Sequence, residues 1–120
     1  KEYRRQRQMC IRDRNYMTNE NLLNKGLELL HMLEEDLEYI GAEDYHQLMR
    51  AWELKHRLMT SQCVTHHTLF RKETRWPGYY YRGDHMKLDD DNWHCLTVSR
   101  RDPNSGEFSL EKAPLYHIVD

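Results

Sequence analysis

The fold is decided by a long helical segment, residues 43–70, which reads EDYHQLMRAWELKHRLMTSQCVTHHTLF. Apolar and aromatic side chains recur along it in steps of three or four without a change of phase, which is the period of one helix face. This stripe comprises Tyr45, Leu48, Met49, Trp52, His56, Met59, Cys63, His66 and Phe70. The segment therefore predicts one helix of about 28 residues, with a weak point at Thr60 and Ser61, where a bend is easiest.

A second amphipathic segment precedes the first. Thr18 is a suitable N-cap, and Glu20 places a negative charge at the positive end of the helix dipole. Gly41 can supply the left-handed residue that ends many helices. The apolar stripe comprises Leu22, Leu23, Gly26, Leu27, Leu29, Leu30, Leu33, Leu37 and Ile40. The two helices, joined by a short connection, are expected to form an antiparallel hairpin.

The C-terminal third follows a different period. Polar and apolar residues alternate over residues 94–101 and again over 107–112, and the turn DPNSG occupies 102–106, which predicts a β-hairpin at about 94–112. The segment Trp76-Pro77-Gly78 lies before this predicted hairpin and breaks the long helix. The predicted fold class is mainly α, with a helical hairpin or bundle of two long amphipathic helices followed by a loop-rich segment and a C-terminal β-hairpin.

The core is lean for a chain of 120 residues. Leu, Ile, Val and Phe number 23 in all, and much of the remaining apolar surface comes from 8 Tyr, 3 Trp and 6 Met. A domain of this size buries only about two-thirds of its unfolded surface. The helix flank that carries Trp52, Met59 and Phe70 also needs a cover, either the C-terminal strands or a domain outside this chain. We therefore interpret the chain as part of a larger protein.

The composition disfavours several classes of protein. The mean hydropathy is −1.02 and no run of 18 apolar residues occurs, so the sequence predicts neither a membrane span nor a secretory signal. Residues 1–14 carry six basic and two acidic groups, whereas residues 15–54 carry two basic and nine acidic ones. We interpret residues 1–14 as a solvated basic N-terminal arm and expect no nucleic-acid binding, because no binding motif follows and an acidic helix does. The three widely spaced cysteines, Cys10, Cys63 and Cys95, indicate reduced thiols in the cytoplasm.

Three histidines lie on or beside the long stripe, but their spacing does not suit a metal site. A zincin-like pair needs His at i and i+4, whereas His56 and His66 are ten residues apart, and His66 and His67 point to different faces. The run Asp89-Asp90-Asp91-Asn92 lacks the alternation of a calcium loop, so we interpret it as a turn or helix start. No GxGxxG or GxxxxGK[ST] loop and no nucleophile elbow occurs. We expect no catalytic, cofactor-binding or metal-ligating residue here.

The loop after the long helix has the composition of a protein interface. Residues 75–82 read RWPGYYYR and bring aromatic rings beside planar guanidinium donors, which are residue types enriched at interfaces. Local packing beneath a loop is the alternative interpretation. The interface candidates are Arg75, Trp76, Tyr79, Tyr80, Tyr81 and Arg82.

The same region carries a family resemblance. Residues 70–95 read FRKETRWPGYYYRGDHMKLDDDNWHC, which closely resembles the C-terminal region of the alpha subunits of dissimilatory adenylylsulfate reductases. The segments YMTNE at 16–20, RAWEL at 50–54 and DPNSGE at 102–107 agree with the same family. The resemblance covers about residues 15–120, and the string ETRWPGYYYR is specific to this reductase within its superfamily.

A more distant likeness places the chain in a wider superfamily. Residues 71–75, with Asp84 and residues 89–93, are similar to the R-x-E-S-R-G…D…D-D-x-N-W pattern of fumarate reductase and succinate dehydrogenase flavoproteins. In that pattern a glycine takes the place of Trp76-Pro77. The likeness implies that residues 15–120 are a flavoprotein C-terminal helical domain.

The resemblance implies an oxidoreductase activity for the full subunit. Such alpha subunits carry FAD and work with an iron-sulfur beta subunit, whose 4Fe-4S clusters pass electrons to the flavin. The substrates implied are adenylyl sulfate, reduced to sulfite and AMP, or the reverse. The FAD-binding and capping domains precede this region, so the fragment itself is expected to bind no FAD, to be inactive, and to brace the flavin domain and help form subunit contacts.

The first residues depart from the family. Lys1 to Gln8 are assigned to the preceding helix, whereas residues 9–14, MCIRDR, resemble translated sequencing-adaptor readthrough, so the arm is partly suspect as non-native sequence. The alternative function is a stand-alone helical protein-binding module that uses the tyrosine-rich loop. A reading frame that continues upstream into GxGxxG favours the reductase, and a gene that starts near Lys1 favours the module. A histidine-based metal module would require stoichiometric metal after purification.

Overall fold

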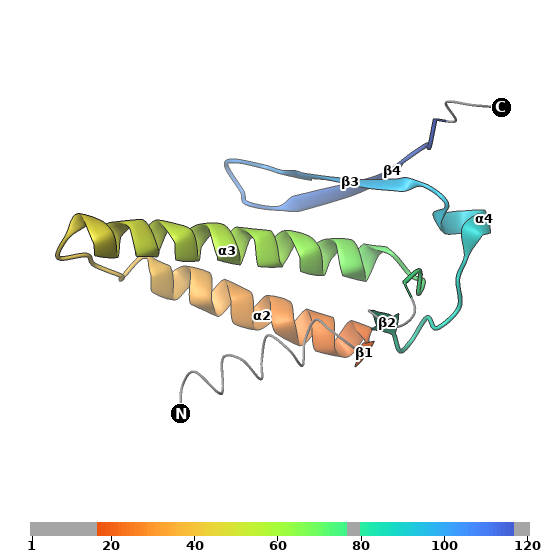
Figure 1. Ribbon diagram of the computed structural model, residues 1–120, viewed down its shortest axis with the longest axis horizontal. Helices are drawn as coiled ribbons and strands as arrows, with labels where there is room; N and C mark the ends of the chain where they lie inside the picture. The colour runs from red at the N-terminus through yellow and green to blue at the C-terminus, as the bar shows by residue number, and fades with distance from the viewer. Residues whose placement is uncertain (1–16, 77–79, 117–120) are drawn as a thin grey trace.

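Two antiparallel helices carry a β-hairpin laid along one of them (Figure 1). The structure is a computed structural model that describes residues 17–76 and 80–116, so the basic N-terminal arm lies outside the described residues. The elements, in order, are β1 (Met17–Thr18), α2 (Glu20–Leu37), α3 (Tyr45–Phe70), β2 (Tyr81–Arg82), α4 (Asp90–Trp93), β3 (Leu96–Arg101) and β4 (Phe108–Ala113). The prediction of a mainly helical fold is confirmed.

Both long helices begin at a side-chain cap. Asp44 caps α3 as its Oδ1 accepts a 2.7 Å hydrogen bond from the N–H of Gln47. The cap of α2 is Asn19, whose Oδ1 accepts from the N–H of Leu22 at 2.8 Å, so the prediction of Thr18 was wrong by one residue. Thr18 instead belongs to β1, which pairs in parallel with β2.

The end of α2 also differs from the prediction. Gly41 does not serve as a left-handed cap, since Gly106 is the one positive-φ glycine among the described residues. The N–H groups of Glu38, Tyr39 and Ile40 instead bond carbonyls three residues back, at 3.1 to 3.3 Å. These tight turns satisfy the last carbonyls of α2, so no left-handed residue is needed.

The long helix α3 is continuous through Thr60 and Ser61. The Thr60 hydroxyl donates to the carbonyl of His56 at 2.9 Å, and the Thr65 hydroxyl donates to that of Ser61 at 2.8 Å. Because these hydroxyls bond within the helix, they do not interrupt its backbone ladder. The prediction of one long helix is confirmed.

The face of α3 that packs on α2 is partly polar. Its buried residues are Leu58, Gln62 and Thr65, none of which belongs to the predicted apolar stripe. Gln62 donates to the Glu34 carboxylate of α2 at 2.7 Å. Hydrophobic periodicity does not reveal this face, because a paired glutamine can occupy a buried position that periodicity assigns to solvent.

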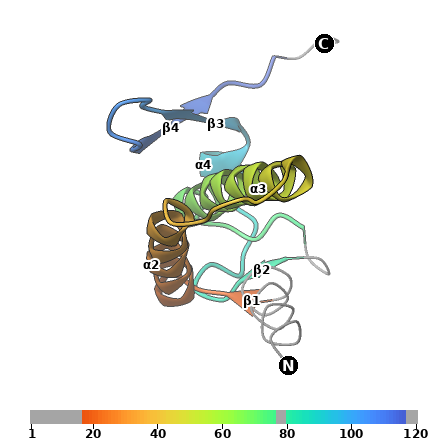
Figure 2. The ribbon, with the colours of Figure 1, turned by 90° about the vertical axis from the view of Figure 1, so that its left-hand side faces the viewer.

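The C-terminal half of the predicted stripe instead faces the β-hairpin, and α3 lies between α2 and that hairpin (Figure 2). Strands β3 and β4 pair antiparallel from Leu96 opposite Ala113 to Arg101 opposite Phe108, so the predicted hairpin is present. The His66 ring of α3 stacks on Phe108, with centroids 4.7 Å apart. The hairpin is therefore the cover over this half of α3.

The hydrophobic core is small, as the composition predicts. Among the described residues, the buried hydrophobic side chains are Leu23, Leu58 and Trp93. Phe70 is covered by Trp93 in an edge-to-face contact at 5.4 Å, whereas Trp52 remains 53% exposed. Within residues 17–76 and 80–116 no helix has the length and apolar character to cross a membrane.

Candidate functional site

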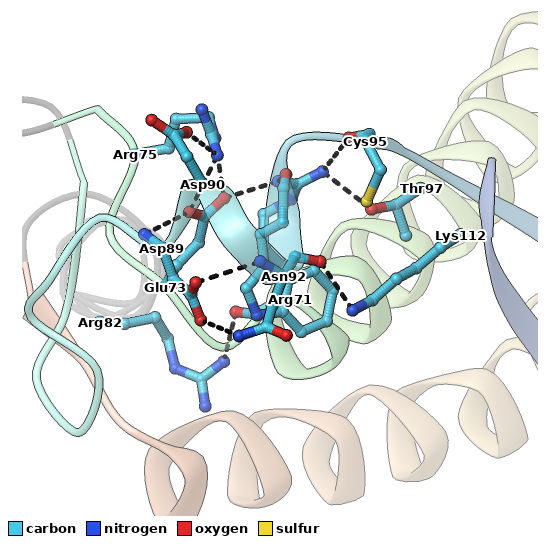
Figure 3. Close-up of polar contacts among 11 residues, drawn as sticks. Arg71, Glu73, Arg75, Arg82, Asp89, Asp90, Asn92, Cys95, Thr97 and Lys112 are labelled. Atoms are coloured by element: carbon cyan, nitrogen blue, oxygen red, sulfur yellow. Dashed lines mark hydrogen bonds and ion pairs between the residues drawn. The ribbon is translucent and has the colours of Figure 1, made fainter. Parts of the chain in front are cut away.

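Charged side chains converge where α3 ends and meets α4 and β3 (Figure 3). The helix stops at Phe70 because Arg71 adopts extended backbone with ψ of 105°. The chain beyond it, residues 71–76, carries the R-x-E-x-R spacing. This segment lies beyond the last residue of α3.

Glu73 is the centre of this cluster, and its side chain is fully buried. Its carboxylate accepts from Arg71 at 2.6 Å, from Arg75 at 2.8 and 3.0 Å, and from the backbone N–H of Asp89 at 3.1 Å. Burial raises the pKa of Glu73, but the hydrogen bonds from Arg75, Arg71 and Asp89 outweigh it and hold the pKa below its usual value. Glu73 is therefore a buried anion with all of its charge compensated.

Arg71 ties the end of α3 to β3. Its guanidinium donates to the carbonyls of Trp93 and Cys95, both at 2.8 Å, and to the Thr97 hydroxyl at 3.0 Å. With its bond to Glu73, these contacts use most of its donors. Arg71 therefore acts as a structural clamp and leaves little capacity for an external anion.

A second ion pair lies on the α2 side of the cluster. Arg82 is completely buried and donates to Asp84 through two bonds of 2.9 Å. It also donates to the carbonyl of Thr68, and to those of Leu69 at 3.3 Å and Arg71 at 3.1 Å. The hydrogen bonds from Arg82, helped by its charge, lower the pKa of Asp84 to about 2. Arg82 thus satisfies the carbonyls that end α3.

The acidic run forms a helix start. Asp89 caps α4 by accepting from the backbone N–H of Asn92 at 3.1 Å and from its side-chain amide at 2.8 Å. Asp90 pairs with Arg75 at 3.0 Å. The interpretation of this run as a helix start is confirmed, and no group of three His, Cys, Asp or Glu is placed to hold a metal within the described part of the chain.

An open cleft of about 380 Å³ lies beside the cluster. Its lining combines Arg71 and Arg75 with aromatic rings and with residues from the end of α3 and the start of β3. The lining residues are His67, Thr68, Arg71, Glu73, Arg75, Trp76, Tyr80, Cys95, Leu96 and Thr97. Arg71 and Arg75 are paired with acidic side chains. The cleft therefore offers aromatic and hydrogen-bonding surface more than unpaired charge.

The predicted interface residues divide into three groups. Trp76 is 70% exposed and Arg75 is partly exposed at the rim of the cleft. Tyr80 and Tyr81 are partly buried, and the Tyr80 oxygen accepts from the Thr18 hydroxyl at 3.1 Å. Arg82 is buried inside the chain and presents no surface to a partner. Tyr79 lies outside the described residues.

The three histidines on or beside the stripe of α3 make different contacts. His67 is 2.8 Å from the Ser99 hydroxyl, whereas His66 stacks on Phe108. Burial, with repulsion from His31 and His67, lowers the pKa of His66 and favours its neutral form. Both residues thus contact the hairpin, whereas His56 lies beside Trp52, with ring centroids 6.0 Å apart.

The described residues do not fit the phosphates of FAD. Dinucleotide sites hold pyrophosphate on successive backbone N–H groups of a glycine-rich turn. Here the positive-φ glycine, Gly106, lies in the β-hairpin turn, and its N–H bonds the carbonyl of Asp102 at 2.8 Å. The arginines of the cleft are already paired with Glu73 and Asp90.

The sequence alone did not identify the two residues that organise this site. Arg82 was predicted to lie at an interface surface, and no role was predicted for Glu73. The available signal was spacing, because a glutamate two residues from an arginine on each side, next to a structure-breaking Trp-Pro-Gly, is typical of a charge-compensated turn.

The chain belongs to a flavoprotein family. The family described as fumarate reductase flavoprotein C-term matches residues 4–118, which places the chain among the C-terminal domains of fumarate reductase-type flavoproteins. Within this class, it is similar to the adenylylsulfate reductase subunit alpha of Megalodesulfovibrio gigas. The two are 44% identical over 104 residues, which are 87% of this chain and 16% of that protein. The resemblance inferred from the motifs is confirmed.

Solved structures show the same relation. The adenosine-5-phosphosulfate reductase in complex with sulfite and the adenylylsulfate reductase of Archaeoglobus fulgidus both match with a TM-score of 0.84 and 50% identity, over 88% of this chain and 16% of theirs. Quinol fumarate reductase of E. coli matches with a TM-score of 0.74 at 24% identity, over 87% of this chain and 19% of its own, which is a likeness of fold. The chain thus spans about 16% of the adenylylsulfate reductase chains that it matches.

Proposed function

We propose that the chain is the C-terminal part of the alpha subunit of an adenylylsulfate reductase. The observation that carries this proposal is identity of 44% to 50% with such chains over 87% to 88% of the residues, against 24% with a fumarate reductase. The full subunit would be a cytoplasmic oxidoreductase that uses FAD to reduce adenylyl sulfate to sulfite and AMP, or catalyses the reverse. An iron-sulfur beta subunit with 4Fe-4S clusters would exchange electrons with the flavin.

Within that subunit, this region has a structural role and supplies no catalytic or FAD-binding residue. Two features of the described residues support this role. The charged groups around Glu73 and Arg82 are paired with one another, and the backbone offers no phosphate cradle. The FAD and capping domains upstream therefore bind the cofactor and substrate, and this domain braces them.

The rim of the cleft is the proposed contact for a neighbouring subunit or domain. Trp76 and Arg75 are the members of the predicted set that are both described and accessible at this rim. Tyr80 and Tyr81 are partly buried, and Tyr79 remains a candidate. An exposed tryptophan beside an arginine has the chemistry of an interface anchor.

Expression of the complete reading frame together with the beta subunit tests the proposal. We expect a yellow, FAD-containing complex that reduces adenylyl sulfate, whereas residues 15–120 alone contain no flavin.

Fusion of the domain to its upstream partner should raise the melting temperature of the domain, because apolar surface becomes buried. Identical melting of the free and joined forms would contradict the bracing role.

A stand-alone helical protein-binding module is the second candidate. The exposed Trp76 is the observation that favours it, since an accessible indole suits recognition of a protein. The upstream sequence discriminates between them. A gene that starts near Lys1 and encodes no dinucleotide-binding domain would favour the module.

A further inference from the structure

A continuous apolar stripe on α3 is covered over only half of its length. The β-hairpin lies over the half nearer α4 and leaves bare the half next to the α2–α3 connection (Figure 1). In the covered half, Cys63 lies 3.5 Å from Ser99 and Phe70 packs on Trp93. The uncovered half, here called the open α3 stripe, consists of Tyr45, Met49, Trp52, His56 and Met59.

The exposure of the open α3 stripe is high for side chains of this kind. Trp52 is 53% exposed, Met49 is 51% exposed and Met59 is 39% exposed. The Trp52 ring is bordered by His56, at 6.0 Å between ring centroids, and by the Lys55 ammonium, 5.2 Å from the ring centroid. Large exposed aromatic and thioether groups in one row on a helix mark a contact surface more often than free solvent.

The charges around the stripe indicate the chemistry of its partner. Arg50, Lys55 and Arg57 flank it, and Glu53 is the single acidic residue between Tyr45 and Met59. Glu53 lies 3.8 Å from Arg57, so residues 45–59 keep a net positive charge, whereas Glu43 and Asp44 precede the Tyr45 end of the stripe. A partner that buries the row must therefore carry an apolar ridge with carboxylates along its edge.

We propose that the open α3 stripe seats an apolar, carboxylate-edged segment of the FAD-bearing part of the same subunit. This inference rests on the proposed function and names the surface through which the bracing acts. The relatives are several times longer than this chain, which covers 16% of them, so a large upstream body is available to fill the site. The stripe also continues along the same face of α3 beneath the β-hairpin. The docked segment would therefore lie on α3 beside the hairpin and cover the rest of that face.

Oxidation of methionines in the complete subunit tests this proposal, with control residues in the same chain. Met49 and Met59 lie on the open α3 stripe, whereas Met32, 61% exposed, lies on α2. Brief treatment with dilute peroxide, followed by mass spectrometry of the peptides, gives the oxidation rate of each residue. We expect Met49 and Met59 to react about tenfold more slowly than Met32, because a buried thioether is shielded from the oxidant.

A substitution tests whether the methionines are protected by docking on the open α3 stripe. Trp52→Ala in the complete subunit should accelerate oxidation of Met49 and Met59 severalfold. Leu88→Ala, at a 54% exposed position in the loop before α4, should leave both rates unchanged. An FAD-containing subunit in which Met49 reacts as fast as Met32 overturns the inference and leaves the proposed function standing. If the methionines are protected only when two copies of the subunit associate, a second copy occupies the stripe, and this outcome also overturns the inference. A reading frame without an upstream flavin domain overturns both.

Discussion

The buried guanidinium of Arg82 binds the carboxylate of Asp84 through two hydrogen bonds of 2.9 Å and donates to the carbonyls that end α3. One side chain therefore holds the loop after α3 against the helix terminus. Strand β2, to which Arg82 belongs, pairs with β1 at the start of α2. The contact thus joins three segments that are distant in sequence, which makes it central to the stability of this end of the domain.

Removal of the Arg82 charge should destabilise the fold strongly. Arg82→Met leaves Asp84 and several carbonyls without their donor, so we expect the free energy of unfolding to fall by about 3 kcal/mol or more. Arg82→Lys keeps the charge without the planar fork and should recover only part of the loss. Urea denaturation followed by circular dichroism measures both changes, and a loss below about 1 kcal/mol for Arg82→Met would contradict this role.

The same pair predicts a loss of stability in acid. The pKa of Asp84 is lowered from 3.8 to about 2 in the folded state, so the unfolded state binds more protons between these values. The contribution is complete above about pH 5 and is lost as the pH falls toward 2, by about 2 kcal/mol in all. The lowered pKa of Glu73 acts in the same direction. Asp84→Asn should flatten the dependence of unfolding free energy on pH, and an unchanged slope would show that other carboxylates cause it.

Neutralisation of Glu73 should be costly, and its exposed neighbour provides the control. Glu73→Gln leaves two arginines facing a neutral group in a buried position, so we expect a loss of about 3 kcal/mol in unfolding free energy. Asp90, whose side chain is 60% exposed, contacts the same Arg75. Asp90→Asn should change stability by less than about 0.5 kcal/mol. Equal effects of the two substitutions in denaturant titrations would argue against Glu73 as the centre of the cluster.

Two glycines should respond to alanine with opposite signs. Gly106 has φ of 74°, and an added Cβ would lie 3.3 Å from Arg101 Nη2, so Gly106→Ala should cost about 1 to 2 kcal/mol. Gly26 lies inside α2 with nothing within 4 Å of an added Cβ. Gly26→Ala should therefore stabilise the domain by about 0.5 to 1 kcal/mol. Thermal unfolding of both variants measures these changes, and destabilisation by Gly26→Ala would contradict the open space around Gly26.

Local sequence signals predicted the elements of this fold well. The helical period of residues 43–70 and the alternation around the DPNSG turn are properties of neighbouring residues, and the corresponding α3 and β-hairpin are present. The cap of α2 was misassigned by one residue because Thr18 and Asn19 are both good caps. The choice between them depends on the pairing of Thr18 with β2, which is a long-range contact.

Burial of polar groups was not predictable from local signals. Gln62, Glu73 and Arg82 are buried because each meets a partner that is set by the fold, and hydrophobicity alone assigns such residues to the surface. The specific motif at residues 70–95 nevertheless identified the family, since it is a string of side chains and not a period.

The flavin content of the complete subunit and of the isolated domain distinguishes a brace from a cofactor-binding domain. We expect the complete subunit to purify with stoichiometric FAD, whereas residues 15–120, expressed alone and incubated with FAD, retain none. Absorbance of the bound flavin after gel filtration provides the measurement for both. A stoichiometric yellow complex of the isolated fragment would contradict the assignment of this chain as a brace without a cofactor site.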